Sequence, residues 1–199
     1  MGGASAPVDE VVGFLHTFAP GALAKLQAEH PMQRALLEPG QLAGTEDQDA
    51  NLLIEVALVG LTEALTVSAT TLPVLRARIA RSQMWLFVGQ LCSMIGGASI
   101  IATLALDAAK LATYGAGILT LLGSAATLFG QHLDGTLHPG MGKVVDTYRE
   151  LADHRVEAAQ IHTTLTVARA ANRLNDALKA VPRANELCLQ MGKLINRII

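Results

Sequence analysis

The chain has 199 residues, of which 51% are hydrophobic and only 16% are charged. Soluble domains usually carry roughly 25% charged residues, so the deficit indicates that part of the chain contacts something other than water. A net charge of −2 gives no basic field, and direct binding of duplex nucleic acid is not expected. The two cysteines lack a CxxC spacing and favour neither a zinc site nor a disulfide framework.

Residues 8–37 carry a helical apolar pattern that prolines interrupt. Pro20 and Pro31 each deny the backbone a hydrogen-bond donor, so we expect two short helices here instead of one long helix. The glycine- and proline-containing stretch 38–44 is expected to be a loop.

A longer helix is expected to begin at a capping box, with Thr45 as its N-cap and Gln48 three residues on. Pro73 should kink or end it. Its first part is long and apolar enough for a membrane segment, but Glu55 and Glu63 would each cost about 2.5 kcal/mol or more near the bilayer centre. A helix that lies along the interface or packs on its partners is preferred, and contact with the membrane stays open.

Two uncharged stretches follow, 82–106 and 111–131, and only Asp107 to Lys110 separates them. A bilayer core about 30 Å thick needs about 20 helical residues, which both stretches supply. Because the connection is so short, the two helices must be antiparallel neighbours. The sequence therefore predicts a two-helix transmembrane hairpin over 82–133.

Basic residues gather outside the two ends of this hairpin: Arg76, Arg78, Arg81, Lys143, Arg149 and Arg155. The hairpin tip carries only Lys110. The positive-inside rule then places both chain termini in the cytoplasm and the hairpin tip on the other side of the membrane. The alternative is a soluble bundle with two very apolar core helices, but a chain of this size can hardly surround two such helices on all sides.

After the hairpin, one long helix is expected from about Met141 to Ala180, and Pro182 is expected at the start of a last helix. The fold class is thus an all-α membrane protein with three regions. These are cytoplasmic or interfacial helices over 1–81, the transmembrane hairpin over 82–133, and cytoplasmic C-terminal helices over 134–199.

Small and polar residues mark the two predicted spans. Ridges of small residues at four-residue spacing let helices approach closely. They comprise Gly89, Ser93 and Gly97 in the first span, and Ala112, Ala116, Thr120 and Ser124 in the second. Gln90 and Gln131 add amides at membrane depth, where polar groups face protein or water. Each candidate either lines an aqueous path or packs one helix on another, and the sequence leaves both readings open.

The sequence contains no nucleophile elbow, phosphate loop or HExxH motif, and its six histidines are scattered. We therefore expect no enzyme, no cofactor and no metal site.

The second span and the segment after it resemble a known family. The run GAGILTLLGSAATLFG, then a histidine and a proline, then VVDTYRELADHRVEAA, is similar to the SLATT domain, the SMODS- and SLOG-associating two-transmembrane effector domain. The resemblance covers roughly residues 75–165. Tyr148 and Leu151 stand where that family has a Tyr-x-x-Leu-like element. The family brings no catalytic residues to this chain.

The resemblance implies a membrane effector of a bacterial conflict system such as antiphage defence, controlled by a regulatory sensor or by a nucleotide-producing partner or its product. The expected activity is permeabilisation of the inner membrane. Two helices alone cannot enclose a water path, so a pore requires a homo-oligomer, of which a tetramer is one form. The alternative is a membrane-anchored scaffold or signalling subunit whose hairpin is only an anchor.

Overall fold

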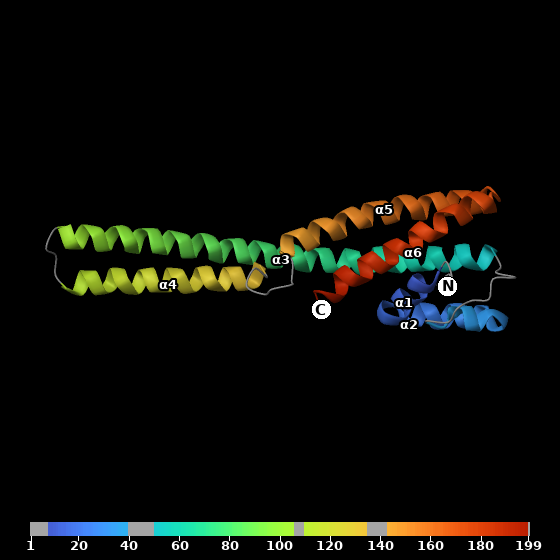
Figure 1. Cartoon of the computed structure of the whole chain (residues 1–199), viewed down its shortest axis with the longest axis horizontal. Helices are drawn as coiled ribbons and strands as arrows, with labels where there is room; N and C mark the ends of the chain where they lie inside the picture. Colours follow the sequence, from blue (N-terminus) through green and yellow to red (C-terminus); the bar gives the residue numbers. More distant parts are fainter. Residues whose placement is uncertain (1–7, 40–49, 106–109, 135–142, 199) are drawn as a thin grey trace, which may run out of the picture. The chain divides into compact units, whose positions relative to one another are not determined.

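The computed structural model describes residues 8–39, 50–105, 110–134 and 143–198 (Figure 1), and every element in these ranges is a helix, which confirms the all-α class. The predicted capping box at Thr45 and Gln48 lies outside the described residues. The elements are α1 (Asp9–Phe18), α2 (Pro20–Glu29), the 3-10 helix η1 (Pro31–Leu37), α3 (Ala50–Ala105), α4 (Lys110–Asp134), α5 (Val144–Ala170) and α6 (Leu174–Asn196).

Prolines divide the N-terminal segment where the sequence predicted. Pro20 is the first residue of α2, and Pro31 is the first residue of η1. A proline costs little at the first helical position because its missing N–H would have no partner inside the helix.

Pro73, in contrast, does not end its helix. α3 continues through it for 56 residues, so the alternative that the helix would stop at this proline was wrong. Leu72 and Leu75, on either side of the proline, are both buried. Their packing favours the helical path even though proline removes one backbone hydrogen bond.

The chain forms two compact units, one from residues 1–72 and 149–199 and the other from 73–148. The N-terminal and C-terminal regions, which the sequence presented as separate, therefore contribute to a single helical bundle. In this bundle α5 and α6 diverge from the turn that joins them, and α6 crosses the first part of α3 obliquely (Figure 1). α1 packs on α6.

Three helices of the bundle meet closely at Gly60 of α3. A Cβ atom added there would collide with the Val11 side chain of α1 and lie 3.6 Å from the Cys188 sulfur of α6. The Val11 amide also donates a hydrogen bond to Asn185 Oδ1 of α6 at 3.0 Å. The absence of a side chain at position 60 is therefore what lets α1, α3 and α6 share one core.

The apolar first part of α3 is buried inside this bundle. Its inward residues are Leu52, Leu53, Ile54, Val56, Ala57, Leu61 and Ala64. Glu55 points outward, where Arg169 Nη2 donates to its Oε2 at 3.2 Å and His30 Nε2 lies 3.9 Å from its Oε1. Protein packing accounts for the hydrophobicity of this stretch, as in the core of a soluble bundle.

α5 and α6 are joined by charged groups as well as by core packing. Arg183 Nε donates to Glu157 Oε1 at 2.6 Å, and its Nη2 donates to Oε2 at 2.8 Å. The hydrogen bond from Arg183 holds the pKa of the Glu157 carboxyl below its ordinary value, and the same contact raises the pKa of Arg183. Both side chains are more than one third exposed, so the pair contributes about 1 kcal/mol or less.

The prediction of one helix from Met141 to Ala180 was wrong, because a turn separates α5 from α6. Asn172 has a positive φ of 54°. Arg173 N–H bonds to the Ala168 carbonyl at 2.8 Å and Asn172 N–H bonds to the Arg169 carbonyl at 3.0 Å, the pattern of a Schellman helix end. Pro182, expected to begin the last helix, lies inside α6.

Substitution of Asn172 tests this helix end. Asn172→Gly should raise the free energy of unfolding by up to about 1 kcal/mol, and Asn172→Val should lower it by about 1–2 kcal/mol, because a β-branched residue disfavours positive φ. Asn175→Gly, at an exposed position in the first turn of α6, is the matched control and should destabilise by about 0.3 kcal/mol, because asparagine is itself a weak helix former. Thermal denaturation of the full chain followed by circular dichroism measures all three. A destabilising Asn172→Gly would contradict the assignment.

Candidate functional site

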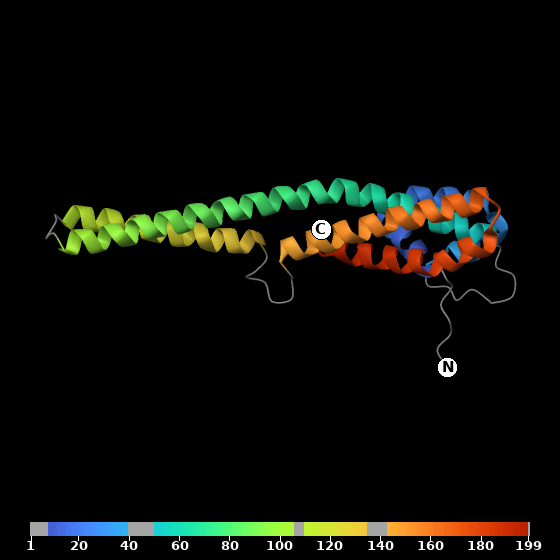
Figure 2. The ribbon, with the colours of Figure 1, turned by 90° about the horizontal axis from the view of Figure 1, so that it is seen from above.

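The second unit is built on two neighbouring helical segments, residues 82–101 of α3 and 114–134 of α4, here called the helix pair. Both ribbon views show these segments side by side (Figures 1 and 2). Ser82 Oγ donates to the Gly130 carbonyl at 2.9 Å, and the Gly96 backbone lies against that of Ala116 and Thr120. The start of one segment thus contacts the end of the other, so the two run antiparallel.

Small residues form the contact between these segments, here called the seam. The seam alternates four- and three-residue steps through Ser82, Leu86, Gly89, Ser93 and Gly96 on α3, and through Ala116, Thr120, Gly123, Thr127 and Gly130 on α4.

The backbones touch at the seam glycines. A Cβ atom on Gly123 would lie 2.6 Å from the Ser93 nitrogen and 2.7 Å from the Gly89 carbonyl oxygen. On Gly96 it would lie 2.9 Å from the Ala116 carbonyl oxygen, and on Gly130 it would lie 3.0 Å from the Leu86 nitrogen. Such close backbone approach is how helices associate where hydrophobic burial supplies no driving force.

The eight small and polar candidates in the two spans divide into two sets. Those in the seam are Gly89, Ser93, Ala116 and Thr120. Those outside it are Gln90, Gly97, Ser124 and Gln131. A Cβ on Gly97 would meet nothing within 4 Å, and Gln90 and Ser124 are exposed. The hydroxyl of Ser124 donates within its own helix, to the Thr120 carbonyl at 3.0 Å.

Six seam residues were not among these candidates: Ser82, Leu86, Gly96, Gly123, Thr127 and Gly130. The candidates followed ridges of four-residue steps, whereas two long antiparallel helices stay in contact along a seven-residue repeat. The seven-residue spacing of Gly89 and Gly96, matched by Gly123 and Gly130, was the available signal. The side chain of Ala112, another ridge candidate, lies outside the described residues.

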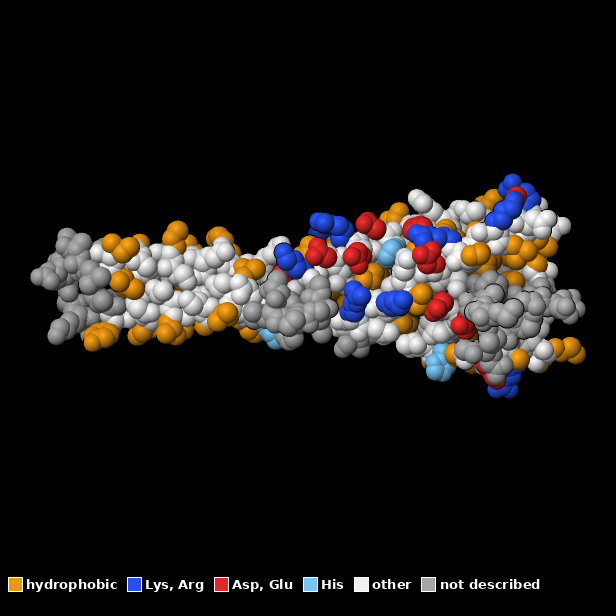
Figure 3. All heavy atoms as spheres, in the orientation of Figure 1, with side chains coloured by type: hydrophobic (Ala, Val, Ile, Leu, Met, Phe, Trp, Pro, Cys, Tyr) orange, Lys and Arg blue, Asp and Glu red, His pale blue; other side chains and the backbone are white. Residues whose placement is uncertain are grey.

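Large apolar side chains cover the opposite surface of the helix pair, here called the outer surface. They are at least 41% exposed and comprise Met84, Phe87, Leu91, Met94, Ile95, Ile101, Tyr114, Ile118, Leu121, Leu122, Leu128 and Phe129. On the face drawn in Figure 3, charged side chains gather over the first unit and hydrophobic ones line the helix pair. In a water-soluble bundle the large apolar residues point inward; here they point outward and glycines point inward.

In the described part of the chain, two helical segments, Ala50–Ile101 and Tyr114–Asp134, are long and apolar enough to cross a membrane. Burial distinguishes their parts. Much of 52–69 is core of the first unit, whereas from 84 to 101 only Gly89 and Gly96 are buried. The segments with both the composition and the exposure for lipid contact are therefore those of the helix pair.

Aromatic and basic side chains mark the ends of the helix pair. Trp85 packs edge-to-face on Phe129, with ring centroids 5.5 Å apart, and Tyr114 is exposed at the opposite end. Arg78 Nε donates to the Leu133 carbonyl in the last turn of α4 at 2.9 Å, where a cation also suits the helix dipole. Aromatic rings at both ends and arginines at one end are typical of membrane interfaces.

Tyr148 and Leu151, the residues of the family-like element, lie in the first two turns of α5. Leu151 is fully buried, and Tyr148 is half-buried. Leu151 therefore has a packing role in the bundle.

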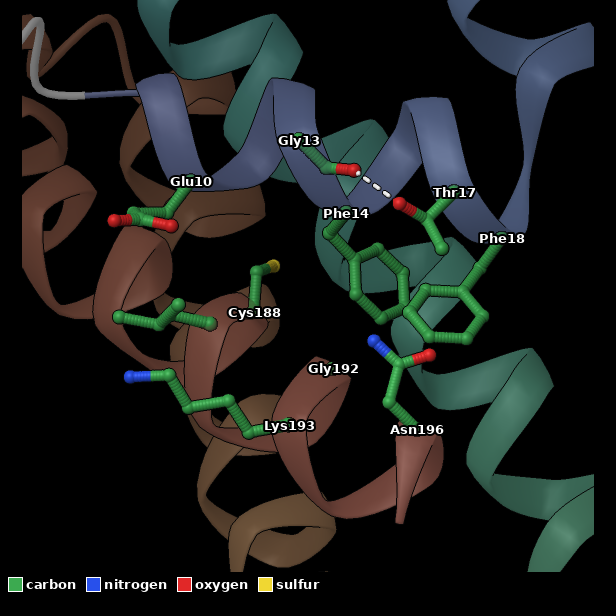
Figure 4. A pocket seen from close by; sticks show the side chains of 10 residues that line it. Glu10, Gly13, Phe14, Thr17, Phe18, Cys188, Gly192, Lys193 and Asn196 are labelled. Carbon is green, nitrogen blue, oxygen red and sulfur yellow. Dashed lines mark hydrogen bonds between the residues drawn. The ribbon is translucent and has the colours of Figure 1, made fainter. Parts of the chain in front are cut away.

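A groove of about 150 Å³ lies between α1 and α6 (Figure 4). The Phe14 and Phe18 rings, with centroids 4.8 Å apart, and Gly192 line its apolar part. Burial raises the pKa of the neighbouring Cys188 thiol to about 12, so this cysteine is not a nucleophile at neutral pH.

A second cavity, of about 330 Å³, lies between α2 and α3 and is lined by Glu55, Leu58, Thr62 and Glu63 among others. Thr62 of α3, which lines this cavity, places its Oγ1 3.2 Å from Nε2 of His162 on α5. Within the described part of the chain, no three His, Cys, Asp or Glu side chains gather in a way that could hold a metal ion.

No family model matches this chain, and no curated protein or solved structure shows significant similarity to it.

Proposed function

We propose that this chain is a regulated membrane effector that inserts the helix pair as a transmembrane hairpin, oligomerises, and permeabilises the bacterial inner membrane. The observation that carries the proposal is the inverted packing of the helix pair, with glycines inside and large apolar side chains outside. Burying each outward Leu, Ile or Phe away from water contributes about 1.5–3 kcal/mol. Lipid supplies that burial to both helices at once.

The dimensions and charges of the helix pair support insertion. Tyr114–Asp134 has 21 residues, and a bilayer core needs about 20. No charged residue occurs between Ser82 and Ile101, and arginines precede Ser82. The positive-inside rule then favours a cytoplasmic location for both termini and for the bundle.

The closed seam supports an oligomer. The two backbones touch along their length, so no water passes between the two helices of one chain. A water path must therefore lie between copies, which favours a homo-oligomer with cyclic symmetry, such as a tetramer. Permeabilisation and control by a sensor or nucleotide-producing partner are drawn from the resemblance to the SLATT family. The bundle is the part that would receive that signal.

The second candidate function is a membrane-anchored scaffold or signalling subunit. The observation that favours it is the bundle itself, which has its own core and presents the groove between α1 and α6. In this case the hairpin only holds the bundle at the membrane.

Dye release from vesicles distinguishes the two functions. The full chain is reconstituted into vesicles of bacterial inner-membrane lipids containing a self-quenched dye, and co-flotation of protein with the vesicles is measured in parallel. An oligomeric pore should release dye more steeply than in proportion to protein density. The assay is repeated in the presence of the nucleotide-producing partner and its product. Protein that floats with the vesicles but releases no dye at any density under either condition supports the anchor and excludes the pore.

A further inference from the structure

The helix pair carries a stripe of small and polar residues just beside the seam, here called the polar face. It comprises Gln83, Gln90 and Gly97 of α3, and Gly117, Ser124 and Gln131 of α4. Each set repeats at seven residues, which returns to nearly the same side of an α-helix. Each member directly follows a seam residue, as Gln90 follows Gly89 and Ser124 follows Gly123.

Both stripes lie on the same side of the helix pair. One residue along an α-helix is a rotation of about 100°, so each stripe lies about a quarter turn from the seam. The two helices face each other and run in opposite directions, so the same rotation brings both stripes to one side. Because Ser82 pairs with Gly130, and Gly89 with Gly123 and Thr127, Gln83 lies level with Gln131 and Gln90 level with Ser124.

The other side of the seam has a different composition. It presents Trp85, Cys92, Leu119, Ala126 and Phe129, with Ser99 as its one hydroxyl among the described residues. The Trp85–Phe129 ring contact lies on this side, at the end of the helix pair that contains Ser82 and Gly130. On the side of the polar face, Phe87, Met94, Leu121 and Leu128 directly follow the remaining seam residues and border the polar face on its outer edge. The two sides therefore differ in the strip next to the seam, where, among the described residues, only the polar face carries glutamine amides.

Hydrogen bonding explains why the polar face cannot point at lipid. Gln90 is exposed, and in the described part of the chain its amide makes no hydrogen bond. It lies about 12 Å along the helix from Ser82 at 1.5 Å per residue, well inside the hydrocarbon of an inserted hairpin. An amide left without a hydrogen-bond partner in hydrocarbon is strongly unfavourable. An amide is also both donor and acceptor, so this face is complementary to itself.

The polar face also lacks bulk at its far end. A Cβ on Gly97 or Gly117 would meet nothing within 4 Å, so the packing of this chain does not require glycine at either position. Gly115, on the other side of the seam, is open as well. Gly97 and Gly117 differ from Gly115 because they lie at the same height along the helix pair and both belong to the polar face. Together they leave room for another helix to approach.

We propose that the polar face is the surface on which a second copy of this chain packs, polar face toward polar face around the axis of the oligomer, while the remaining outer surface contacts lipid. The inference rests on the membrane insertion proposed above. It adds which side of the hairpin turns inward.

Cysteine cross-linking tests the orientation. Gln90→Cys and Ser124→Cys are made in a Cys92→Ala background, while Cys188 stays because it is buried and unreactive. The matched controls are Leu91→Cys and Ala125→Cys, which are exposed and lie one residue further at the same depth. Membranes holding each full-length variant are oxidised with copper phenanthroline. A disulfide needs Cβ atoms about 4 Å apart, so the polar-face variants should give about tenfold more cross-linked dimer than their controls.

Equal cross-linking at Gln90 and Leu91, or no dimer from either polar-face variant in protein that is in the membrane, would overturn the proposal. Its failure is separable from failure of the proposed function. Selective cross-linking in vesicles that release no dye, even with the nucleotide-producing partner and its product, excludes the pore and keeps the interface. Dye release without selective cross-linking excludes the polar face as the interface and keeps the pore.

Discussion

Replacing Ile118 and Leu121 together by aspartate should remove the full chain from the membrane fraction. Both side chains are on the outer surface, 62% and 71% exposed, and neither belongs to the seam or the polar face. On the scale of insertion energies, a charged residue near the centre of a helix costs about 2.5–3.5 kcal/mol, whereas a leucine, isoleucine or phenylalanine contributes only about 0.3–0.6 kcal/mol. Two aspartates therefore cost more than the remaining large apolar residues of α4 offset. The measurement is the fraction of protein that resists extraction from membranes by alkaline carbonate.

Val156→Asp with Val167→Asp is the control for this double substitution. These two valines are also exposed, at 61% and 52%, but they lie on α5 in the bundle. The control protein should stay in the membrane fraction as the wild type does. If the Ile118 and Leu121 variant remained equally resistant to carbonate, or if the wild type were extracted, the outer surface would not be a lipid contact.

Gly123→Ala should separate the two helices of the pair at a much lower detergent concentration than in the wild type. The added methyl would lie 2.6 Å from the Ser93 nitrogen and 2.7 Å from the Gly89 carbonyl oxygen, both backbone atoms that cannot rotate away. One helix must then move, and overpacking of this kind costs about 1–3 kcal/mol. Trp85 is the only tryptophan of the chain and contacts Phe129 across the pair. Its fluorescence, followed while SDS is titrated into mixed micelles, therefore reports the separation.

Gly115→Ala provides the matched control, because it makes the same change on the same helix. Its new methyl would meet nothing within 4 Å. Its titration midpoint should equal that of the wild type or exceed it slightly, since alanine favours a helix by about 1 kcal/mol over glycine. Coinciding midpoints for the Gly115 and Gly123 variants would show that the seam is not a close contact.

The two units of the chain pack by opposite rules. In the bundle, Leu15, Ile54, Leu61, Leu187 and Met191 are fully buried, as the hydrophobic effect in water requires. In the helix pair the buried positions are glycine, serine and alanine, and the leucines and isoleucines face outward. This reversal supports the proposal that the helix pair contacts lipid whereas the bundle contacts water.

The sequence alone determined the helical class, the proline boundaries of α2 and η1, and the two uncharged stretches. These features depend on local properties, namely backbone donors, composition and length, so neighbouring residues suffice to predict them. The sequence also indicated Gly89, Ser93, Ala116 and Thr120, which the structure places in the seam, but it did not single out Gly96, Gly123 and Gly130.

Tertiary structure decided which side each residue occupies. A four-residue ridge and a seven-residue seam share Gly89 and Ser93 but differ at Gly96 and Gly97, and only the facing helix selects between them. The same holds for the apolar stretch 52–69, whose hydrophobicity fits lipid or protein equally until α1, α5 and α6 pack against it. Pro73 inside α3 and the turn at Asn172 depended on packing and on a single backbone conformation, which propensity alone does not fix.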